Sequence, residues 1–330
     1  MIISRTPLRM SFVGGGSDLP SFYREHGGAV LSTAIDKFVY VSINKRFDDG
    51  LRVVYSKTEE VADVEEIEHQ LFKSTFKVMD VAGGVEVTTI ADIPSKGTGL
   101  GSSSSFTVGL INAVAAHQGK YVSAEEMARE SCRIEIDICG APIGKQDQYA
   151  AAYGGFNLIE FKSDDRVAVT PMIVPRSELE QLQRRIIVFY TGITRSASVI
   201  LSQQDAAVTS NASKQKVLCR MVGLAREARD ELQRGNLDSF GAILDENWQL
   251  KRSLTTGIST AEIDTWYDLA IKEGALGGKI LGAGAGGFLM FYANEEHHPK
   301  IAKALDVLRP VHFGFEPEGS KIIFYNPTNH

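Results

Sequence analysis

The segment SKGTGLGSSSSFTVG, residues 95–109, combines four glycines and five serines and then turns apolar. Ordering each glycine costs roughly 0.5–1 kcal/mol relative to alanine, because glycine loses the most backbone freedom on folding. A strand-like run precedes the segment, and apolar residues at helical spacing follow it. The loop would therefore end at a helix N-terminus, whose unpaired N–H groups bind anions. Serine hydroxyls add donors or a metal ligand. These residues favour a phosphate-binding loop over the alternative, a flexible surface loop with serine caps.

Two further glycine clusters lie far from this segment in the chain. Gly14–Gly16 follow the strand-like run TPLRMSFV, and GAGAGG occupies residues 282–287. The second cluster satisfies G-x-G-x-x-G, but a dinucleotide site requires that pattern to open a helix, and the strand-like FLMFY follows it here. We therefore reject a Rossmann site. The P-loop pattern G-x-x-x-x-G-K-[ST] occurs nowhere in the chain. Three clusters so widely separated in sequence could converge on a single ligand.

The elements that must position these loops are mainly strands in the first half of the chain. Partial alternation of β-branched residues predicts strands in LRMSFV, FVYVSI, GLRVVY, VEVTTIADI and FNLIEF. FTVGLINAVAAHQ predicts a helix after the serine-rich loop. A second helix is predicted to begin at Ser123, because Glu126 lies three residues further on as in a capping box, and to stop at Gly140. KQDQYAAAY predicts a short third helix.

The second half is mainly helical. RRIIVFYTGITR predicts a buried strand, and residues 197–276 carry a helical pattern. Strands return in FLMFYA and SKIIFYN, with the helix PKIAKALDVL between them. The sequence thus predicts an α+β protein. Its internal boundary is expected near residues 165–185, where Pro171 and Pro175 interrupt the pattern.

The composition excludes several classes of function. A net charge of −6 and a pI near 5.7 argue against a nucleic-acid partner or an anionic membrane surface, both of which favour basic patches. The sequence has no run of about 18 apolar residues, so a membrane span is not expected. The N-terminus lacks the features of a signal peptide. The three cysteines form neither a paired framework nor a metal-ligand spacing, which suits a reducing compartment. We expect a cytoplasmic enzyme with a small-molecule substrate, and leave a homodimer open.

The three glycine motifs together resemble those of the GHMP kinases, the superfamily of galactokinase, homoserine kinase, mevalonate kinase and phosphomevalonate kinase. The resemblance rests on TPLRMSFVGGGSD, PSKGTGLGSSSS and GAGAGG in this order, and it spans nearly the whole sequence. It implies a two-domain GHMP kinase fold. Residues 1–170 would form an ATP-binding domain like ribosomal protein S5 domain 2, with a left-handed βαβ unit, and residues 171–330 a ferredoxin-like domain.

Within the superfamily, GGGSDLPSFYREHGGAVLSTAIDKFVYV and GKQDQYAAAYGGFN are most similar to the D-glycero-D-manno-heptose 7-phosphate kinases, and similar also to the kinase portion of L-fucokinase. Both groups phosphorylate an anomeric hydroxyl. The resemblance implies conversion of the heptose 7-phosphate to the 1,7-bisphosphate, a step toward nucleotide-activated heptose. The alternatives are an anomeric kinase for an unphosphorylated sugar such as L-fucose, and a non-catalytic sugar-sensing homologue.

The resemblance also implies which residues hold ATP and Mg²⁺. Ser103 and Glu135 match the positions that ligate Mg²⁺ in the family. Ser103 could instead only cap a helix, and Glu135 could be a solvated acid, since Glu130 and Asp137 lie close by in sequence. The residues expected at the nucleotide are Pro94, Lys96, Gly97, Gly99, Leu100, Gly101, Ser102, Ser103 and Ser104.

Asp147 in GKQDQY matches the catalytic aspartate of the family and would accept the proton of the attacking sugar hydroxyl. A simpler interpretation is an acid that stabilises a helix N-terminus. Arg9 matches the basic residue of the first motif and would stabilise the developing alkoxide. Without the motif, an arginine in a strand is more often a surface residue.

Asp18 matches the sugar-binding aspartate of the sugar-kinase branch, with a turn-capping role as the alternative. Arg195 would contact the sugar or its distal phosphate. Leu281 is a departure, because related kinases often carry a hydroxyl residue before the third motif. The residues expected at the substrate are Gly15, Gly16, Ser17, Asp18, Asp147, Arg195 and Gly284, and further candidates for a distal phosphate are Lys45, Arg46 and Arg252.

Overall fold

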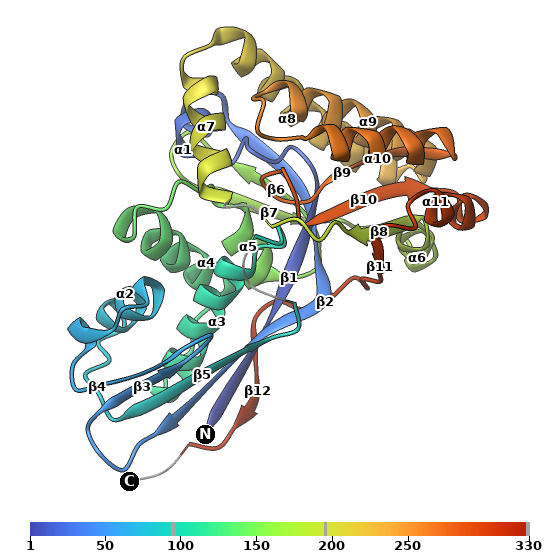
Figure 1. Cartoon of the computed structure of the whole chain (residues 1–330). Coiled ribbons are helices and arrows are strands. Elements are labelled where there is room, and N and C mark those ends of the chain that lie inside the picture. The colour runs from blue at the N-terminus through green and yellow to red at the C-terminus, as the bar shows by residue number, and fades with distance from the viewer. Residues whose placement is uncertain (94–96, 195–196, 328–330) are drawn as a thin grey trace.

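The computed structural model describes residues 1–93, 97–194 and 197–327 and contains, within them, two β-sheets. Two long antiparallel strands, β1 (Ile2–Val13) and β2 (Gly28–Lys45), run through the larger sheet. β2 is long enough to pair with β1 along its length, with β6 along its first half and with β5 along its second half. The sheet therefore splits at β2 (Figure 1).

The other strands of this sheet come from both ends of the chain. β12, the last strand before the C-terminus, pairs with β1, and the two lie side by side at the lower end of the molecule (Figure 1). β3 and β5 are parallel, and the remaining pairs are antiparallel. The bounds are β3 (Leu51–Val54), β4 (Thr58–Val61), β5 (Val85–Ala91), β6 (Phe156–Phe161), β7 (Val167–Pro171) and β12 (Lys321–Tyr325).

Helices cover one face of the larger sheet, and α3 (Ser102–His117) packs directly on β1 and β2. The predicted capping box is confirmed: Ser123 and Glu126 hydrogen-bond each other's backbone N–H groups at the start of α4 (Ala124–Cys132). A π-helical segment, Arg133–Ile138, continues α4. The other helical segments of this half are α1 (Pro20–His26), a 3₁₀ turn (Val64–Glu66), α2 (Gln70–Val78) and α5 (Gln146–Tyr153).

The second sheet is antiparallel with the strand order β11-β8-β10-β9. Chain order gives the strand–helix–strand–strand–helix–strand succession of a ferredoxin-like unit, as predicted. Its strands are β8 (Ile186–Tyr190), β9 (Ala275–Ile280), β10 (Phe288–Ala293) and β11 (Arg309–Val311). Its helices are α6 (Arg176–Arg184), α7 (Ala197–Thr209), α8 (Ala212–Gln233), α9 (Leu237–Ser253), α10 (Ala261–Lys272), a 3₁₀ turn (Glu295–His297) and α11 (His298–Ala304).

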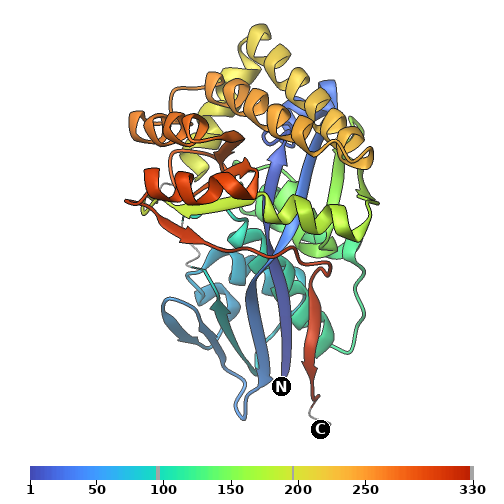
Figure 2. The ribbon, with the colours of Figure 1, turned by 90° about the vertical axis from the view of Figure 1, so that its right-hand side faces the viewer.

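The two halves share one apolar core. α8 packs on β1 and β2 as well as on α9, and Figure 2 shows these two helices lying over the upper ends of the long strands. The ring of Phe12 on β1 lies edge-on to Phe156, Phe240 and Phe315, with ring centroids 5.5, 5.5 and 6.3 Å away. Aromatic residues bury large areas, so this cluster ties the larger sheet to α9 and to the segment that carries Phe315.

Several elements differ from the sequence prediction, and some, such as α1, α2 and β7, were not predicted at all. β9 begins at Ala275, inside the segment predicted to be helical, and β2 begins ten residues before the predicted strand FVYVSI. The division at residue 170 stays a prediction. Among the helices of the described residues, none has the length and apolar character needed to cross a membrane.

Candidate functional site

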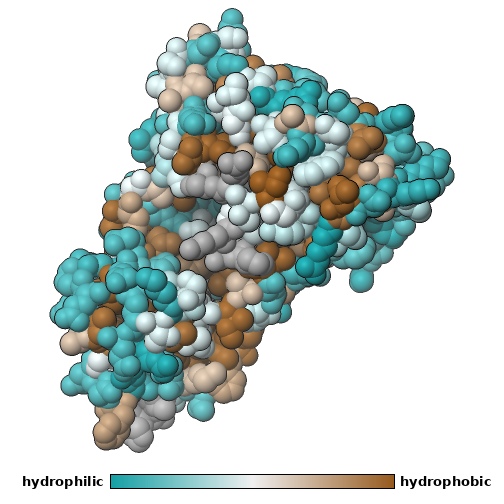
Figure 3. All heavy atoms as spheres, in the orientation of Figure 1, coloured by the Kyte–Doolittle hydropathy of each residue, from teal (hydrophilic) through white to brown (hydrophobic). Residues whose placement is uncertain are grey.

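A cavity of about 400 Å³ lies where the three glycine-rich loops meet. Figure 3 shows a hollow on this face, between α4 and α7. Residues from both halves of the chain surround the cavity. Its lining includes Arg9, Ser11, Gly15, Gly16, Asp18, Gly97, Gly99, Gly101, Ser102, Ser103, Ser104, Glu135, Gln146, Asp147, Ser198, Lys251, Lys279, Gly282 and Ala283.

The serine-rich loop ends at the N-terminus of α3, as the sequence predicts. Gly101 occupies the N-cap position in the left-handed conformation, with φ at 76°, and no side chain among the described residues caps the helix. The first-turn N–H groups of a long helix are thus left without a side-chain cap beside the cavity, the arrangement that receives a phosphate. Leu100 does not line the cavity: its side chain is buried in the core and its carbonyl accepts from the N–H of Arg9 at 3.1 Å.

Glu135 reaches the same end of the cavity from the π-helical segment. Its carboxylate accepts hydrogen bonds from Ser103 (3.1 Å), Ser104 (2.7 Å), Thr107 (3.0 Å) and the side-chain amide of Gln148. Burial raises the pKa of Glu135, and these four donors oppose the rise. With 1% exposure, Glu135 is not the solvated acid of the alternative interpretation.

Ser103 and Glu135 fit a magnesium ion that keeps other ligands. Their contacting oxygens lie 3.1 Å apart, close to the separation of about 3 Å between adjacent ligands of an octahedral Mg²⁺ with bonds of roughly 2.0–2.1 Å. Within the described residues, no group of three or more His, Cys, Asp or Glu side chains could hold a metal. Such an ion would therefore depend on phosphate oxygens and water for its remaining ligands, as Mg²⁺ usually does.

Arg9 and Asp147 form a two-pronged ion pair at the centre of the cavity. The Nε and Nη2 atoms of Arg9 donate to Oδ1 and Oδ2 of Asp147, each at 2.8 Å, and Nη1 donates to the carbonyl of Gly99 at 2.6 Å. The Arg9 side chain is 4% exposed and that of Asp147 24%. Arg9 is thus not a surface residue, and Asp147 remains accessible to a ligand.

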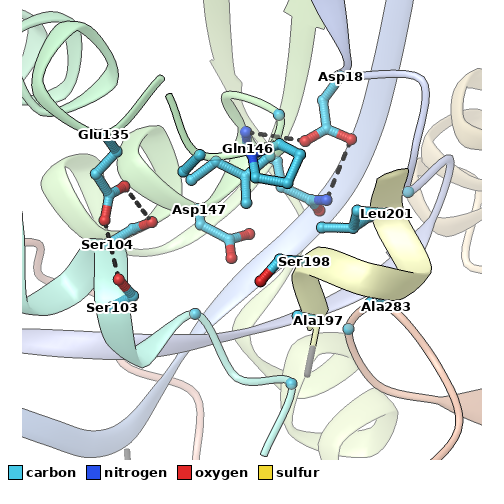
Figure 4. A pocket seen from close by; sticks show the side chains of 18 of the residues that line it. Asp18, Ser103, Ser104, Glu135, Gln146, Asp147, Ala197, Ser198, Leu201 and Ala283 are labelled. Atoms are coloured by element: carbon cyan, nitrogen blue, oxygen red, sulfur yellow. Dashed lines mark hydrogen bonds between the residues drawn. The ribbon is translucent and has the colours of Figure 1, made fainter. Parts of the chain in front are cut away.

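Asp18 lies at the other end of the cavity, close to Gln146 (Figure 4). It accepts from the N–H of Gly16 at 2.9 Å and from the backbone and side chain of Gln146 at 3.3 and 3.2 Å. Burial and repulsion by Asp147 raise the pKa of Asp18, and the backbone N–H donors oppose this rise. Gly144 leaves room for the carboxylate, because a Cβ there would lie 2.0 Å from Asp18 Oδ2. Asp18 therefore stabilises its own loop by hydrogen bonding and also lines the cavity.

The serine-rich loop and the third glycine motif touch through their backbones. A Cβ on Gly99 would lie 2.2 Å from the carbonyl oxygen of Leu281, and a Cβ on Gly282 would lie 2.5 Å from the Cα of Gly99. Both glycines have positive φ angles, 75° and 81°. Glycine is required at these positions by contact as well as by conformation.

Some predicted residues lie away from the cavity. Ser17 donates to the carbonyls of Gly14 and Ala29 within the first loop. Gly284 is not part of the lining and packs on the backbone of Ile258. Pro94, Lys96 and Arg195 lie outside the described residues.

The basic residues proposed for a distal phosphate are also elsewhere. Arg46 pairs with Asp48 and Glu60, and Arg252 pairs with Asp264. Lys45 is exposed and outside the lining. Instead, Lys251 of α9 and Lys279 of β9 line the cavity and are buried. Sequence reasoning missed both, and the nearest signal was the position of Lys279 three residues before the third glycine motif.

Comparisons with known proteins show the family of the chain. Residues 64–155 match the family described as GHMP kinases N terminal domain, and residues 228–308 match the one described as GHMP kinases C terminal. A D-glycero-alpha-D-manno-heptose 7-phosphate kinase of Campylobacter jejuni is 31% identical over 319 residues, which are 92% of this chain and 93% of that protein. The chain belongs to the GHMP kinase family.

Two other proteins are similar to this GHMP kinase. The L-fucokinase/L-fucose-1-P guanylyltransferase of Bacteroides fragilis is 27% identical over 89% of this chain, which spans only 35% of that longer protein. The crystal structure of a D-glycero-D-manno-heptose 1-phosphate kinase from Bacteroides thetaiotaomicron has a TM-score of 0.81, covers 99% of this chain and 100% of its own, and shows the same fold at 24% identity. As a GHMP kinase with sugar-kinase relatives, the chain is a phosphotransferase with an alcohol group as acceptor, and its family uses ATP.

The contact between the glycine loops can be tested with Gly282→Ala. We expect a larger loss of stability than the roughly 1–2 kcal/mol of a left-handed alanine, because the new methyl group also pushes Gly99 away. ATP turnover should fall with it. Gly119→Ala is the matched control, since Gly119 has φ at 71° and no atom of the described residues lies within 4 Å of its Cβ position. Equal urea-unfolding free energies and full activity for both variants would contradict the proposed loop contact.

Proposed function

We propose that this GHMP kinase transfers the γ-phosphoryl group of ATP to the anomeric hydroxyl of D-glycero-D-manno-heptose 7-phosphate, giving the 1,7-bisphosphate for nucleotide-activated heptose biosynthesis. The observation that carries the proposal is the Arg9–Asp147 pair, which lies between the uncapped N-terminus of α3 and the Asp18 loop. Phosphoryl transfer needs this kind of arrangement, with one anion-binding end and one acceptor end.

The triphosphate of ATP would lie against the N-terminus of α3. The backbone of Gly97, Gly99 and Gly101 and the hydroxyls of Ser102, Ser103 and Ser104 line this end of the cavity. The side-chain oxygen of Ser102 is buried and makes no hydrogen bond within the described part of the chain, so it is available to a ligand. Helix N–H groups and hydroxyls together supply donors for several phosphate oxygens.

Ser103 and Glu135 would hold Mg²⁺ at this end, and the ion would neutralise charge on the phosphates. Burial of Glu135 among four donors keeps its carboxylate oriented toward Ser103 and Ser104 before any ligand binds. Positioning of this kind lowers the reorganisation required during the reaction.

Asp147 would accept the proton of the anomeric hydroxyl as that oxygen attacks phosphorus. Arg9 holds both carboxylate oxygens of Asp147 and fixes the direction in which the side chain points. Its charge would also stabilise the developing alkoxide. Asp18 would orient the sugar through its hydroxyl groups, together with the backbone of Gly15 and Gly16.

An unphosphorylated acceptor such as L-fucose is the second candidate. The similarity to the fucokinase of Bacteroides fragilis favours it, because the two chains match along most of the present sequence. The heptose 7-phosphate relative is more similar, at 31% identity, and the match covers 93% of its length.

A screen of acceptors separates these functions. ADP release should be measured with ATP and Mg²⁺ over a panel of neutral sugars and sugar phosphates. We expect the highest kcat/KM with D-glycero-D-manno-heptose 7-phosphate and a product phosphorylated at C1, identified by ³¹P NMR. A higher kcat/KM with L-fucose would replace the first candidate with the second. If none of the sugars in the panel supports ADP release, both candidates are contradicted.

Asp147→Asn tests the proposed base. We expect kcat to fall by about 10² or more, the usual size of an acid–base contribution, with the KM for ATP little changed. Asp137→Asn, at an exposed acid that does not line the cavity, is the control for general effects of charge. Thermal unfolding should be recorded for both variants, because Asp147→Asn also weakens the pair with Arg9. A folded Asp147→Asn enzyme with wild-type kcat would remove Asp147 from the mechanism.

Ser103→Ala tests the proposed metal ligand. We expect the Mg²⁺ concentration for half-maximal rate to rise about 10-fold or more, in the range of effects seen when metal sites lose supporting groups. Ser105→Ala is the matched control on the same helix, because Ser105 donates to the carbonyl of Pro7 at 2.8 Å, away from the cavity. Ser103 does not cap α3, because its hydroxyl donates to Glu135 instead. If this hydrogen bond is its only role, the variant will lose about 1 kcal/mol of stability and keep its Mg²⁺ dependence.

A further inference from the structure

Two buried lysines at the acceptor end have no role in the mechanism above. Lys251 on α9 and Lys279 on β9 line the cavity and are 5% and 3% exposed. Lysine is almost never buried to this extent unless an anion accompanies it. Their burial near the proposed acceptor loop therefore needs an explanation.

The partners of both ammonium groups are neutral. Lys279 Nζ donates to the carbonyl of Ser11 at 2.8 Å, and Lys251 Nζ donates to the carbonyl of Gly15 at 3.0 Å and to the side-chain oxygen of Gln204 at 2.6 Å. Across residues 1–93, 97–194 and 197–327, neither ammonium has an ion-pair partner. An ammonium carries three donors, so both lysines keep donors for a ligand.

The electrostatics of both lysines also favour an anionic ligand. Burial lowers the pKa of Lys251 to about 8, and Asp18 opposes the shift. Burial, with repulsion by Lys251 and Arg9, lowers the pKa of Lys279 to about 7. A neutral sugar leaves these costs in place, whereas an anion between the two ammonium groups offsets them.

A neighbouring hydroxyl group is buried without a partner. The hydroxyl of Ser11 is buried, lines the cavity and has no hydrogen-bond partner in the described residues. It lies near Gly15, where an added Cβ would be 3.5 Å from Ser11 Oγ. A hydroxyl donor beside two ammonium groups matches the several acceptor oxygens of a phosphate.

We propose that Lys251, Lys279 and Ser11 bind a phosphate group carried by the acceptor, and that they select a phosphorylated sugar over a neutral one. This inference rests on the proposed function and deepens it. Lys251 belongs to the acceptor end because its Nζ lies against the first glycine loop, 3.0 Å from the position of a Cβ on Gly16. The proposed nucleotide site is on the other side of Asp147, at Ser103 and Ser104 (Figure 4).

The test compares two acceptors that differ only in the phosphate, D-glycero-D-manno-heptose 7-phosphate and D-glycero-D-manno-heptose. Initial rates are measured for the full-length enzyme and for Lys251→Met and Lys279→Met, which keep the length of the side chain without its charge. We expect kcat/KM for the 7-phosphate to fall about 10²-fold, as when one partner of a buried charge pair is removed. The value for the neutral heptose should change less than about threefold, and the KM for ATP should stay constant. Lys272→Met, on an exposed position of α10, is the control.

Equal losses with both acceptors would overturn the inference. A rise confined to the KM for ATP would overturn it too, because the lysines would then serve the nucleotide. Calorimetric titration of the wild-type enzyme without nucleotide gives a second measurement that needs no variant. It should show binding of the 7-phosphate at least about tenfold tighter than that of the neutral heptose, and equal affinities would contradict the proposal.

The two proposals fail separately. If another phosphorylated sugar is the preferred acceptor and the lysine variants lose it selectively, the heptose assignment is wrong and the phosphate site stands. If the heptose 7-phosphate is turned over but the variants do not discriminate between the acceptors, the phosphate site alone is wrong.

Discussion

The guanidinium of Arg9 is the group on which the arrangement of the site depends. It joins three segments: its own strand β1, the N-terminal turn of α5 through Asp147, and the serine-rich loop through the carbonyl of Gly99. A charged group at 4% exposure is tolerated only when its hydrogen-bond donors are occupied. Arg9 can therefore be buried only when these segments are brought together, and the direction of Asp147 follows from that requirement.

Other charged side chains of the cavity are also buried, and those from the C-terminal half have fewer hydrogen-bond partners. Glu135 has four donors, Asp18 has backbone donors, and Lys279 has one carbonyl. Groups held in place before the ligand arrives need little reorganisation when charge develops. Burying these charged groups costs stability. The apolar core that includes Phe12 and residues of both sheets offsets this cost. The least compensated charges, those of Lys251 and Lys279, are thus found where the proposed acceptor phosphate would supply an anion.

The sequence was a good guide wherever local chemistry decides the structure. The Ser123–Glu126 capping box and the helix after the serine-rich loop follow from short-range hydrogen bonding and periodicity. β9 was missed because ALGGKI contains two glycines, and these are used for contact: a Cβ on Gly277 would lie 2.2 Å from the carbonyl of Gly241. Lys251 was missed because a lysine on an amphipathic helix is normally exposed, and its burial depends on a loop more than 200 residues away. Its neighbour Arg252, which sequence reasoning chose, points to Asp264 instead.

The two halves of the chain contribute different kinds of group to the cavity. The N-terminal half supplies short side chains, helix N–H groups and the Arg9–Asp147 pair, all set by the larger sheet and the helices packed on it. The C-terminal half supplies α7 and the two long lysines, whose reach depends on how α9 and β9 pack against the first glycine loop. Phosphoryl transfer constrains the first set closely, because the attacking oxygen, phosphorus and the leaving oxygen must be in line. In the proposed function, the second set would meet only the remote part of the acceptor. Changes on α7, α9 or β9 can therefore alter which acceptor fits while the Arg9–Asp147 pair and the serine-rich loop stay as they are, and binding energy from that remote part can still be used to place the reacting hydroxyl.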